Sequence, residues 1–551
     1  MRTLLFLLLA AISLQAQPER DARDVERAEK VDALFAAWNR TDAPGYSVAV
    51  IRDGKTVFAK GYGMADLERD VRITPRTVFD IGSTSKQFTA AAVLLLEQEG
   101  KLSLDDDIRK YLPELRAYER PVTIRHLIHH TSGMRDYLAL MGFAGLSFSN
   151  DYSDHETLSW IARQKALNFA PGEEHLYSNS GYYVLGQLVA RVSGMSLRKY
   201  AAQKIFEPLG MTNTHFHDDP TEVVRHRAIG YAPAGSGYTI EMSNYHVVGD
   251  GGLYTTTEDL AKWDANFYDP VVGGATFLES LHRRGKLASG EELNYASALV
   301  HGTHSGHRTV SHGGSWAGYR ADMLRFPEKK LTVIALSNVA SADPSTLARS
   351  VADIYLDTPT PVAAPPSQKT SSGKPKAWTA AQLQAFASLY VDPKTGTYRT
   401  VEMRDGKLWY LRGTRPVELR PLADGTFELT GSPLILRFSN DTVEALLPGQ
   451  PKTVFSRVVA VTPTPAELAV YAGEYRSDEI AAPHHLSVRE GALTARIGFS
   501  AETLVFRPRE RDVFESNDGV RLRFHRDAQG AINAYTIGAG RVKNIRFERA
   551  P

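Results

Sequence analysis

The hydrophobic pattern near the N-terminus changes from helical spacing to strand spacing. Within 20–44, apolar residues recur at helical intervals and predict a helix: Val25, Ala28, Val31, Leu34, Phe35 and Trp38. Two alternating runs follow, Tyr46–Arg52 and Lys55–Ala59, with Asp53-Gly54 between them. Because Asp-Gly between two such runs is a strong two-residue turn signal, these runs predict a β-hairpin.

Helices are predicted in the middle of the first 357 residues and strands at both ends. The apolar run from Gln87 to Glu97 predicts a buried helix that Gly100 terminates. A long helical and loop region reaches about residue 270, and strands return at Tyr319–Phe326 and Leu331–Leu336. This order predicts an antiparallel sheet built from both ends of the segment, with a helical cluster beside it.

The pattern changes again in the C-terminal third. A Pro/Ser/Thr-rich stretch at 358–377 is typical of a linker. Beyond it, short alternating runs separated by turn residues repeat loosely over 380–461 and 466–551, which predicts two small antiparallel β-barrels of seven or eight strands. The predicted fold class is therefore α+β: a sheet-and-helix domain over 20–357, followed by two barrel units.

The extreme N-terminus predicts export. Met1-Arg2 precedes an apolar run from Leu4 to Leu14, which is too short to cross a bilayer, so residues 1–16 are interpreted as a cleaved signal peptide. An uncleaved membrane anchor is the alternative. No later segment is apolar enough to cross a membrane, so we expect no stable span after cleavage and a periplasmic or extracellular location.

Composition excludes several classes of function. The 64 basic residues balance the 63 acidic ones, so the chain has no net charge that would attract nucleic acid. The absence of cysteine excludes disulfides, thiol catalysis and thiolate metal sites.

Ser83-Thr84-Ser85-Lys86 is the first candidate for catalysis. A serine and a lysine three residues apart share one face of a helical turn, and a serine nucleophile needs such a neighbouring base. The same spacing at Ser196–Lys199 fits a helix cap, and the copy at Ser371–Lys374 lies in the linker, so both are attributed to chance.

Tyr177-Ser178-Asn179 is the second candidate. A tyrosine held on a loop beside a lysine could transfer protons, and the Asn179 amide could bind a substrate carbonyl. Alternatively, Tyr177 is a core residue and Asn179 caps a helix.

His312-Gly313-Gly314-Ser315 is the third candidate, at the end of a short strand predicted at Thr309–Ser311. Glycines on an edge strand let a substrate backbone lie close to the sheet.

Two further groups of histidines are possible metal sites: His126, His129 and His130, and His301, His304 and His307. Neither group has carboxylates at ligand spacing, so capping and structural roles are favoured. We predict no metal and no cofactor.

The three motifs in this order resemble the serine β-lactamase and penicillin-binding protein superfamily. Over roughly 30–357 the chain is most similar to the branch that contains class C β-lactamases, D-aminopeptidases, D-alanyl-D-alanine carboxypeptidases and related esterases. The C-terminal units resemble the barrels of D-aminopeptidases and lipocalin-like tails.

This resemblance implies a role for each motif. It implies that Ser83 is the nucleophile, Lys86 its base, and Tyr177 the group that passes the proton to the leaving group. Asn179 would bind the substrate amide, and the backbone N–H groups of Ser83 and Ser315 would form an oxyanion hole.

The sequence departs from the superfamily pattern at His312, where β-lactamases and many penicillin-binding proteins have lysine. A histidine is only partly charged near neutral pH, which favours aminopeptidase- and esterase-like members over β-lactam or carboxylate recognition. The resulting prediction is an exported serine hydrolase that acts on small peptides or amides, with D-residue substrates among the candidates.

Three alternatives stay open: an ester hydrolase, a β-lactamase, and a catalytically idle sensor or binding protein that keeps the fold. The expected partner is a small-molecule or peptide substrate, and the sequence leaves room for an oligomer.

Overall fold

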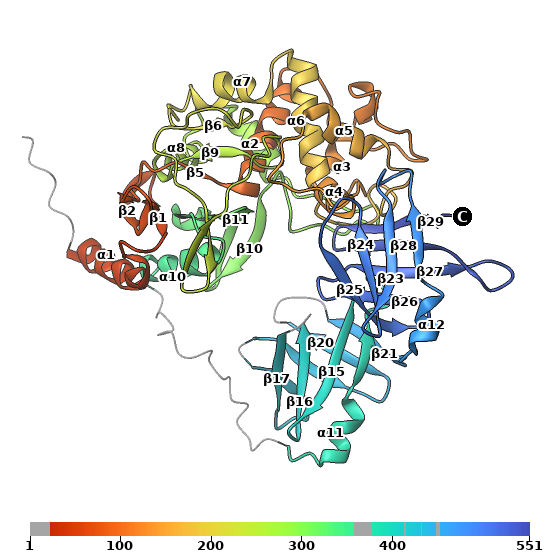
Figure 1. Cartoon of the computed structure of the whole chain (residues 1–551). Helices are drawn as coiled ribbons and strands as arrows, with labels where there is room; N and C mark the ends of the chain where they lie inside the picture. The colour runs from red at the N-terminus through yellow and green to blue at the C-terminus, as the bar shows by residue number, and fades with distance from the viewer. Residues whose placement is uncertain (1–21, 358–375, 413–414, 431, 448–451) are drawn as a thin grey trace, which may run out of the picture.

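A computed structural model of the chain describes residues 22–357, 376–412, 415–430, 432–447 and 452–551. The predicted signal peptide and nearly all of the predicted linker lie outside these residues. The predicted class, an α+β domain followed by two antiparallel barrels, is confirmed (Figure 1). Within the described residues, none of the helices is long and apolar enough to cross a membrane.

A six-stranded antiparallel sheet forms the centre of the first domain, in the order β10-β11-β12-β13-β1-β2. As predicted, strands from the two ends of the domain meet, because Tyr46 pairs with Ser337 and Arg52 with Leu331. The strands are β1 (Tyr46–Arg52), β2 (Lys55–Tyr62), β10 (Val300–His304), β11 (His307–Trp316), β12 (Tyr319–Phe326) and β13 (Leu331–Ser337).

Two terminal helices cover one face of this sheet: α1 (Ala22–Leu34) and α10 (Pro344–Tyr355). Val31 and Val351 pack there against Val48 and Val333, and all four are fully buried. The predicted N-terminal helix over 20–44 is shorter in the structure and is followed by a single 3-10 turn, Ala36–Trp38.

The helical cluster covers the opposite face. Helix α2 (Lys86–Gln98) lies at its centre and packs against α6 (Asn179–Ser193). Gly100 has a φ of +69° just after α2, the left-handed conformation that favours glycine at a helix end. The remaining helices are α3 (Ile124–Ile128), α4 (Tyr137–Phe143), α5 (Asp154–Ala162), α7 (Leu197–Ala201), α8 (Thr257–Ala265) and α9 (Gly274–His282).

Short strands line the junction between sheet and helices. A three-stranded sheet has the order β5-β9-β6, formed by Phe79–Asp80, Leu253–Thr255 and His215–Phe216. Two small hairpins complete the domain: β3 (Met64–Asp66) with β4 (Val71–Arg72), and β7 (Tyr231–Ala234) with β8 (Gly237–Ile240).

Each C-terminal unit is a closed barrel of eight antiparallel strands. A short helix precedes each barrel, α11 (Ala380–Phe386) and α12 (Pro465–Ala469). The first barrel comprises β14 (Ser388–Val391), β15 (Tyr398–Arg404), β16 (Lys407–Arg412), β17 (Arg415–Pro421), β18 (Phe427–Leu429), β19 (Ile435–Phe438), β20 (Thr442–Leu446) and β21 (Thr453–Val458). The second comprises β22 (Gly473–Arg476), β23 (His484–Arg489), β24 (Ala492–Ile497), β25 (Thr503–Glu510), β26 (Val513–Ser516), β27 (Arg521–Arg526), β28 (Ile532–Ala539) and β29 (Val542–Arg549).

The second barrel packs on the helical cluster, near α4 (Figure 1). Leu140 and Phe143 of α4 are buried in one apolar cluster with Ile497 and Phe547 of the barrel. A hydrogen bond from the His484 Nε2 to the Phe143 carbonyl, 2.7 Å, ties the same surfaces together.

Candidate active site

Ser83 and Lys86 lie where the central sheet meets helix α2. Ser83 belongs to a 3-10 turn, Gly82–Ser85, that leads directly into the helix. The turn packs closely on β11, because a Cβ atom added to Gly314 would lie 1.8 Å from the Ile81 carbonyl oxygen. Only glycine fits at position 314, and this close approach fixes the serine beside the strand.

Lys86 is fully buried, and its Nζ contacts three oxygen atoms. These are the Ser83 Oγ at 3.1 Å, the Asn179 Oδ1 at 3.0 Å and the backbone carbonyl of Asp250. The two carbonyl oxygens can only accept hydrogen bonds, whereas a serine hydroxyl can donate or accept. Once it has lost a proton, the Lys86 amine can donate to both carbonyls and still direct its lone pair at the Ser83 hydroxyl.

Tyr177 lies on the loop before α6, facing the same amine. The Lys86 Nζ is 5.0 Å from the centroid of its ring. Its hydroxyl is buried and has no hydrogen-bond partner among the described residues. An unpaired buried hydroxyl is costly in a folded protein, so this one is available to a bound substrate.

Residues 312–315 lie on strand β11 beyond its pairing with β10, where one edge of the strand is free of that neighbour. Pairing with β10 ends at Ser311, and from His312 to Trp316 the strand pairs with β12. The short strand predicted at Thr309–Ser311 is thus part of a longer one. The neighbouring Gly82 has a φ of +49°, and a Cβ there would lie 2.6 Å from the Ser315 nitrogen, so Ser83 and Ser315 are held close together.

A chain of hydrogen bonds determines the tautomers of two buried histidines. The Ser178 N–H donates to the His130 Nδ1 at 3.2 Å, so the proton of a neutral His130 is on Nε2. That proton points to the Tyr295 hydroxyl at 3.1 Å, which in turn donates to the His312 Nε2 at 3.0 Å. The His312 Nδ1–H then donates to the Gly313 carbonyl at 2.7 Å.

His312 is consequently neutral near pH 7. Burial, reinforced by the nearby charge of Lys86, lowers its pKa to about 4. The partly charged histidine expected from the sequence is therefore wrong, because that expectation assumed an exposed ring with an ordinary pKa. The sequence argument that His312 does not recognise a substrate carboxylate becomes stronger, since a neutral ring offers no cation.

Two buried carboxylates complete the inner wall, and the sequence reasoning missed both. Burial raises the pKa of Asp250 to about 6, opposed by Lys86, and raises the pKa of Asp80 to about 7. Asp250 accepts a hydrogen bond from the Tyr137 hydroxyl at 3.0 Å, and Asp80 accepts one from the Gly82 N–H at 2.7 Å.

These groups open into a cavity of about 760 Å³. Ser83, Tyr177 and Asn179 line it together with residues 312–316. Part of its wall is aromatic, because the Tyr245 and Trp316 rings lie 6.1 Å apart and both contribute to the lining. The cavity is therefore large enough for a small organic ligand, and it offers an apolar surface beside the serine.

The second barrel contributes a residue to this cavity. Arg541 lies in the tight turn between β28 and β29, and its guanidinium carbon is 4.5 Å from the centroid of the Tyr177 ring. Its Nη1 donates to the buried Asp136 carboxylate at 3.5 Å. The sequence reasoning did not find Arg541, because nothing in the local sequence shows where a barrel turn lies in space.

Comparisons with known proteins agree with this geometry. A family model described as Beta-lactamase matches residues 28–356, which is more than half of the chain. The chain belongs to the β-lactamase family. It is a serine hydrolase of the β-lactamase and penicillin-binding protein superfamily, as the sequence predicted.

Relatives within this superfamily share the long C-terminal part to different extents. The D-aminopeptidase of Brucella anthropi is 27% identical over 527 residues, covering 92% of this chain and 95% of that protein. Penicillin-binding protein 4* of Bacillus subtilis is 28% identical over 428 residues, with coverages of 74% and 93%. The octameric penicillin-binding protein homologue of Pyrococcus abyssi has a TM-score of 0.56 and 25% identity, covering 88% of this chain and all of that one.

Three of the six histidines considered as metal ligands, His126, His130 and His304, have other partners in this β-lactamase-family fold. The His126 Nδ1 accepts a hydrogen bond from the Thr123 N–H and completes a capping box on α3. His304 pairs with Asp353 at 2.8 Å. His130 belongs to the hydrogen-bond chain behind Tyr177, which agrees with its interpretation as a structural residue of the site.

Proposed function

We propose that this chain hydrolyses amide or peptide bonds through an acyl-enzyme formed on Ser83. The observation that carries the proposal is the 3.1 Å contact between the Lys86 Nζ and the Ser83 Oγ, inside a cavity of about 760 Å³. A serine attacks a carbonyl only when a base removes its proton. A Lys86 amine that donates to two carbonyls keeps its lone pair for that proton.

The remaining groups act on the tetrahedral intermediate and the leaving group. The N–H groups of Ser83 and Ser315 form the oxyanion hole, since the Gly82 and Gly314 contacts bring the two backbones together. The unpaired Tyr177 hydroxyl delivers a proton to the departing amine and then assists water in deacylation. Asn179, held by Lys86, orients the substrate amide.

Small peptides and amides are the preferred substrates, with a D-residue on the acyl side. Similarity to a D-aminopeptidase over 92% of the chain, both barrels included, supports this choice. The neutral His312 argues against recognition of a substrate carboxylate by that residue. The aromatic surface at Tyr245 and Trp316 offers the substrate side chain an apolar contact.

We also propose that the protein works outside the cytoplasm after cleavage of its signal peptide. The motivation is the short apolar run between Leu4 and Leu14. N-terminal sequencing of protein from the periplasmic and extracellular fractions tests this directly. Light scattering of the same sample will show whether this chain assembles, as the Pyrococcus abyssi homologue does.

Labelling with a fluorophosphonate tests the nucleophile. Wild-type protein should be labelled, and Ser83→Ala should lose labelling and at least about 10⁴-fold in turnover. Ser196→Ala is a matched control, because Ser196 and Lys199 repeat the same spacing but Ser196 caps helix α7. Undiminished labelling of Ser83→Ala would refute the proposal.

A substrate panel tests the reaction. D- and L-aminoacyl amides, short p-nitrophenyl esters and nitrocefin should be compared on one preparation. We expect the highest kcat/KM on D-aminoacyl amides. Hydrolysis of esters alone would replace the amidase proposal with an esterase, whereas nitrocefin as the best substrate would reinstate the β-lactamase alternative.

A further inference from the structure

Two histidines project from the same side of strand β6, at the edge of the catalytic cavity. His215 and His217 are two residues apart, and side chains at that spacing point to the same side of an extended chain. His217 also lines the cavity, and its backbone N–H donates a hydrogen bond to the Gly252 carbonyl at 2.8 Å. The loop that follows brings Glu222 back to both rings.

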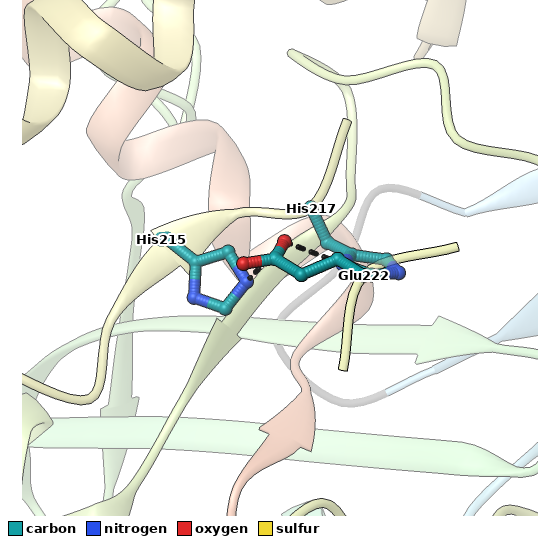
Figure 2. Close-up of side chains that lie close together, drawn as sticks. All are labelled: His215, His217 and Glu222. Carbon is teal, nitrogen blue, oxygen red and sulfur yellow. Dashed lines mark hydrogen bonds and ion pairs between the residues drawn. The ribbon is translucent and has the colours of Figure 1, made fainter. Parts of the chain in front are cut away.

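The spacing of the three side chains matches that of metal ligands. Figure 2 shows the Glu222 carboxylate between the two imidazole rings. Its Oε2 is 3.3 Å from the His215 Nε2 and 3.4 Å from the His217 Nδ1. Ligand atoms bound to zinc at about 2.0–2.1 Å in a tetrahedron lie about 3.3–3.4 Å apart. The third distance, between the two ring nitrogens, is within 4.8 Å.

One of these nitrogens has no other partner. The His215 Nε2 is buried and makes no hydrogen bond to any residue that the structure describes, although the Glu222 oxygen is close. A buried ring nitrogen without a hydrogen bond is unusual. A metal ion placed between the nitrogen and the carboxylate would satisfy it.

The surrounding charges favour a cation and hold the carboxylate in place. Arg198 donates to both Glu222 oxygens, at 2.7 and 2.8 Å, and to Asp218 at 2.9 Å. Arg227 and Asp219 also act on the His217 ring, so three carboxylates and two guanidiniums around the site leave one net negative charge. Because both Glu222 oxygens accept hydrogen bonds from Arg198, the carboxylate is held and oriented by an outer-shell partner, as in known metal sites.

We propose that His215, His217 and Glu222 bind one Zn²⁺ ion. Two imidazole nitrogens and one carboxylate oxygen are a donor set that Zn²⁺ prefers, with a fourth position for water. The prediction of no metal from the sequence rested on two other histidine groups and overlooked this one. The ion joins β6 to the 217–222 loop and so stabilises the cavity wall that His217 and Gly252 form.

Metal titration of the full chain tests this site. Protein without a histidine tag, freed of metal with a chelator, should be titrated with ZnCl₂ by calorimetry. We expect one tight site per chain and a melting temperature that rises by a few degrees with excess Zn²⁺. Wild-type protein loaded with Co²⁺ in place of Zn²⁺ should show the visible absorption of a four-coordinate site, and this measurement needs no variant.

Variants locate the ion. His215→Gln and His217→Gln should each weaken binding by more than about 100-fold, beyond the usual effect of losing an outer-shell partner. His304→Gln is a matched control, because it removes a histidine that pairs with a single carboxylate, Asp353. Melting curves recorded in chelator show whether each variant is folded. Equal Zn²⁺ affinity in all four chains, or no tight site in wild type, would overturn the proposal.

Discussion

The two C-terminal barrels have the same strand count but different neighbours. The second barrel is joined to the hydrolase domain by a buried ion pair, Arg135 with Glu479 at 2.6 Å, and by the apolar cluster on α4. The interdomain contacts that the structure describes for the first barrel are with the second. There Tyr398 donates to Glu510, and Leu389 packs near Val513.

This difference shows that two similar units can have separate roles. The second barrel closes over α4 and places Arg541 beside Tyr177, so it is part of the active-site wall. The first barrel is held through the second one. Variants at the two interfaces should therefore differ in both stability and activity.

Breaking the buried ion pair should have the largest effect on stability. In Arg135→Met the Glu479 carboxylate, 8% exposed, loses its cation, and breaking such a pair costs about 3–5 kcal/mol. Urea unfolding followed by fluorescence would measure this loss. The double variant Arg135→Met/Glu479→Leu should regain part of it, because no uncompensated charge is left. A loss below about 1 kcal/mol in the single variant would contradict the buried interface.

Acid should weaken the same interface through His484. Burial lowers the pKa of His484 to about 4, against about 6.5 in the unfolded chain. Between these values the unfolded state binds the extra proton, so stability is complete above pH 6.5 and falls as the pH drops toward 4. The difference corresponds to about 3 kcal/mol for this one group. His484→Gln should flatten the decline of the unfolding free energy over this pH range.

His129, His282 and His312 also have pKa values lowered to about 4, so the wild-type decline has several sources. The useful measurement is therefore the difference between His484→Gln and wild type. The matched control is a substitution of the neighbouring His485, which is half-buried and contacts Glu474 at 3.6 Å, and it should change the decline less than His484→Gln does. Identical slopes for His484→Gln and wild type would show that His484 is not part of the acid response.

The sequence predicted local elements well, because their signals are local. Strand Tyr319–Phe326 has the predicted bounds, and the strand predicted at Leu331–Leu336 extends only to Ser337, since turn residues mark the boundary between them. The structure also brings Ser83, Tyr177, Asn179 and residues 312–315 together around one cavity, with Lys86 buried behind Ser83. Their catalytic roles stay predictions.

What the sequence missed depends on contacts between distant residues. Arg541 is far from Tyr177 in sequence, and no spacing rule relates a barrel turn to the active site. The neutral state of His312 follows from its burial and its tautomer from the contact with Tyr295, and a His-Gly-Gly-Ser motif shows neither. The group formed by His215, His217 and Glu222 needed the return of a loop to β6.

A substitution at Arg541 tests whether the second barrel takes part in the active site. Its side chain is 45% exposed and its contact with Asp136 is long, so Arg541→Ala should change the melting temperature little. For substrates with a free carboxylate, kcat/KM should fall about tenfold, or ~1.4 kcal/mol, while amide-capped substrates are less affected. Arg541→Lys should retain part of the activity. Equal loss on both substrate types would assign Arg541 to cavity shape rather than to charge.

The smallest effect is expected where the two barrels meet. Tyr398→Phe removes the hydroxyl that donates to Glu510 but keeps the buried ring, so about 1 kcal/mol of stability should be lost. The barrel contact lies outside the catalytic cavity, and kcat/KM on every substrate should equal that of wild type. Urea unfolding and steady-state kinetics on one preparation measure both quantities. If kcat/KM fell together with stability, the first barrel would be coupled to the active site through the second, and the division of roles between the barrels would be wrong.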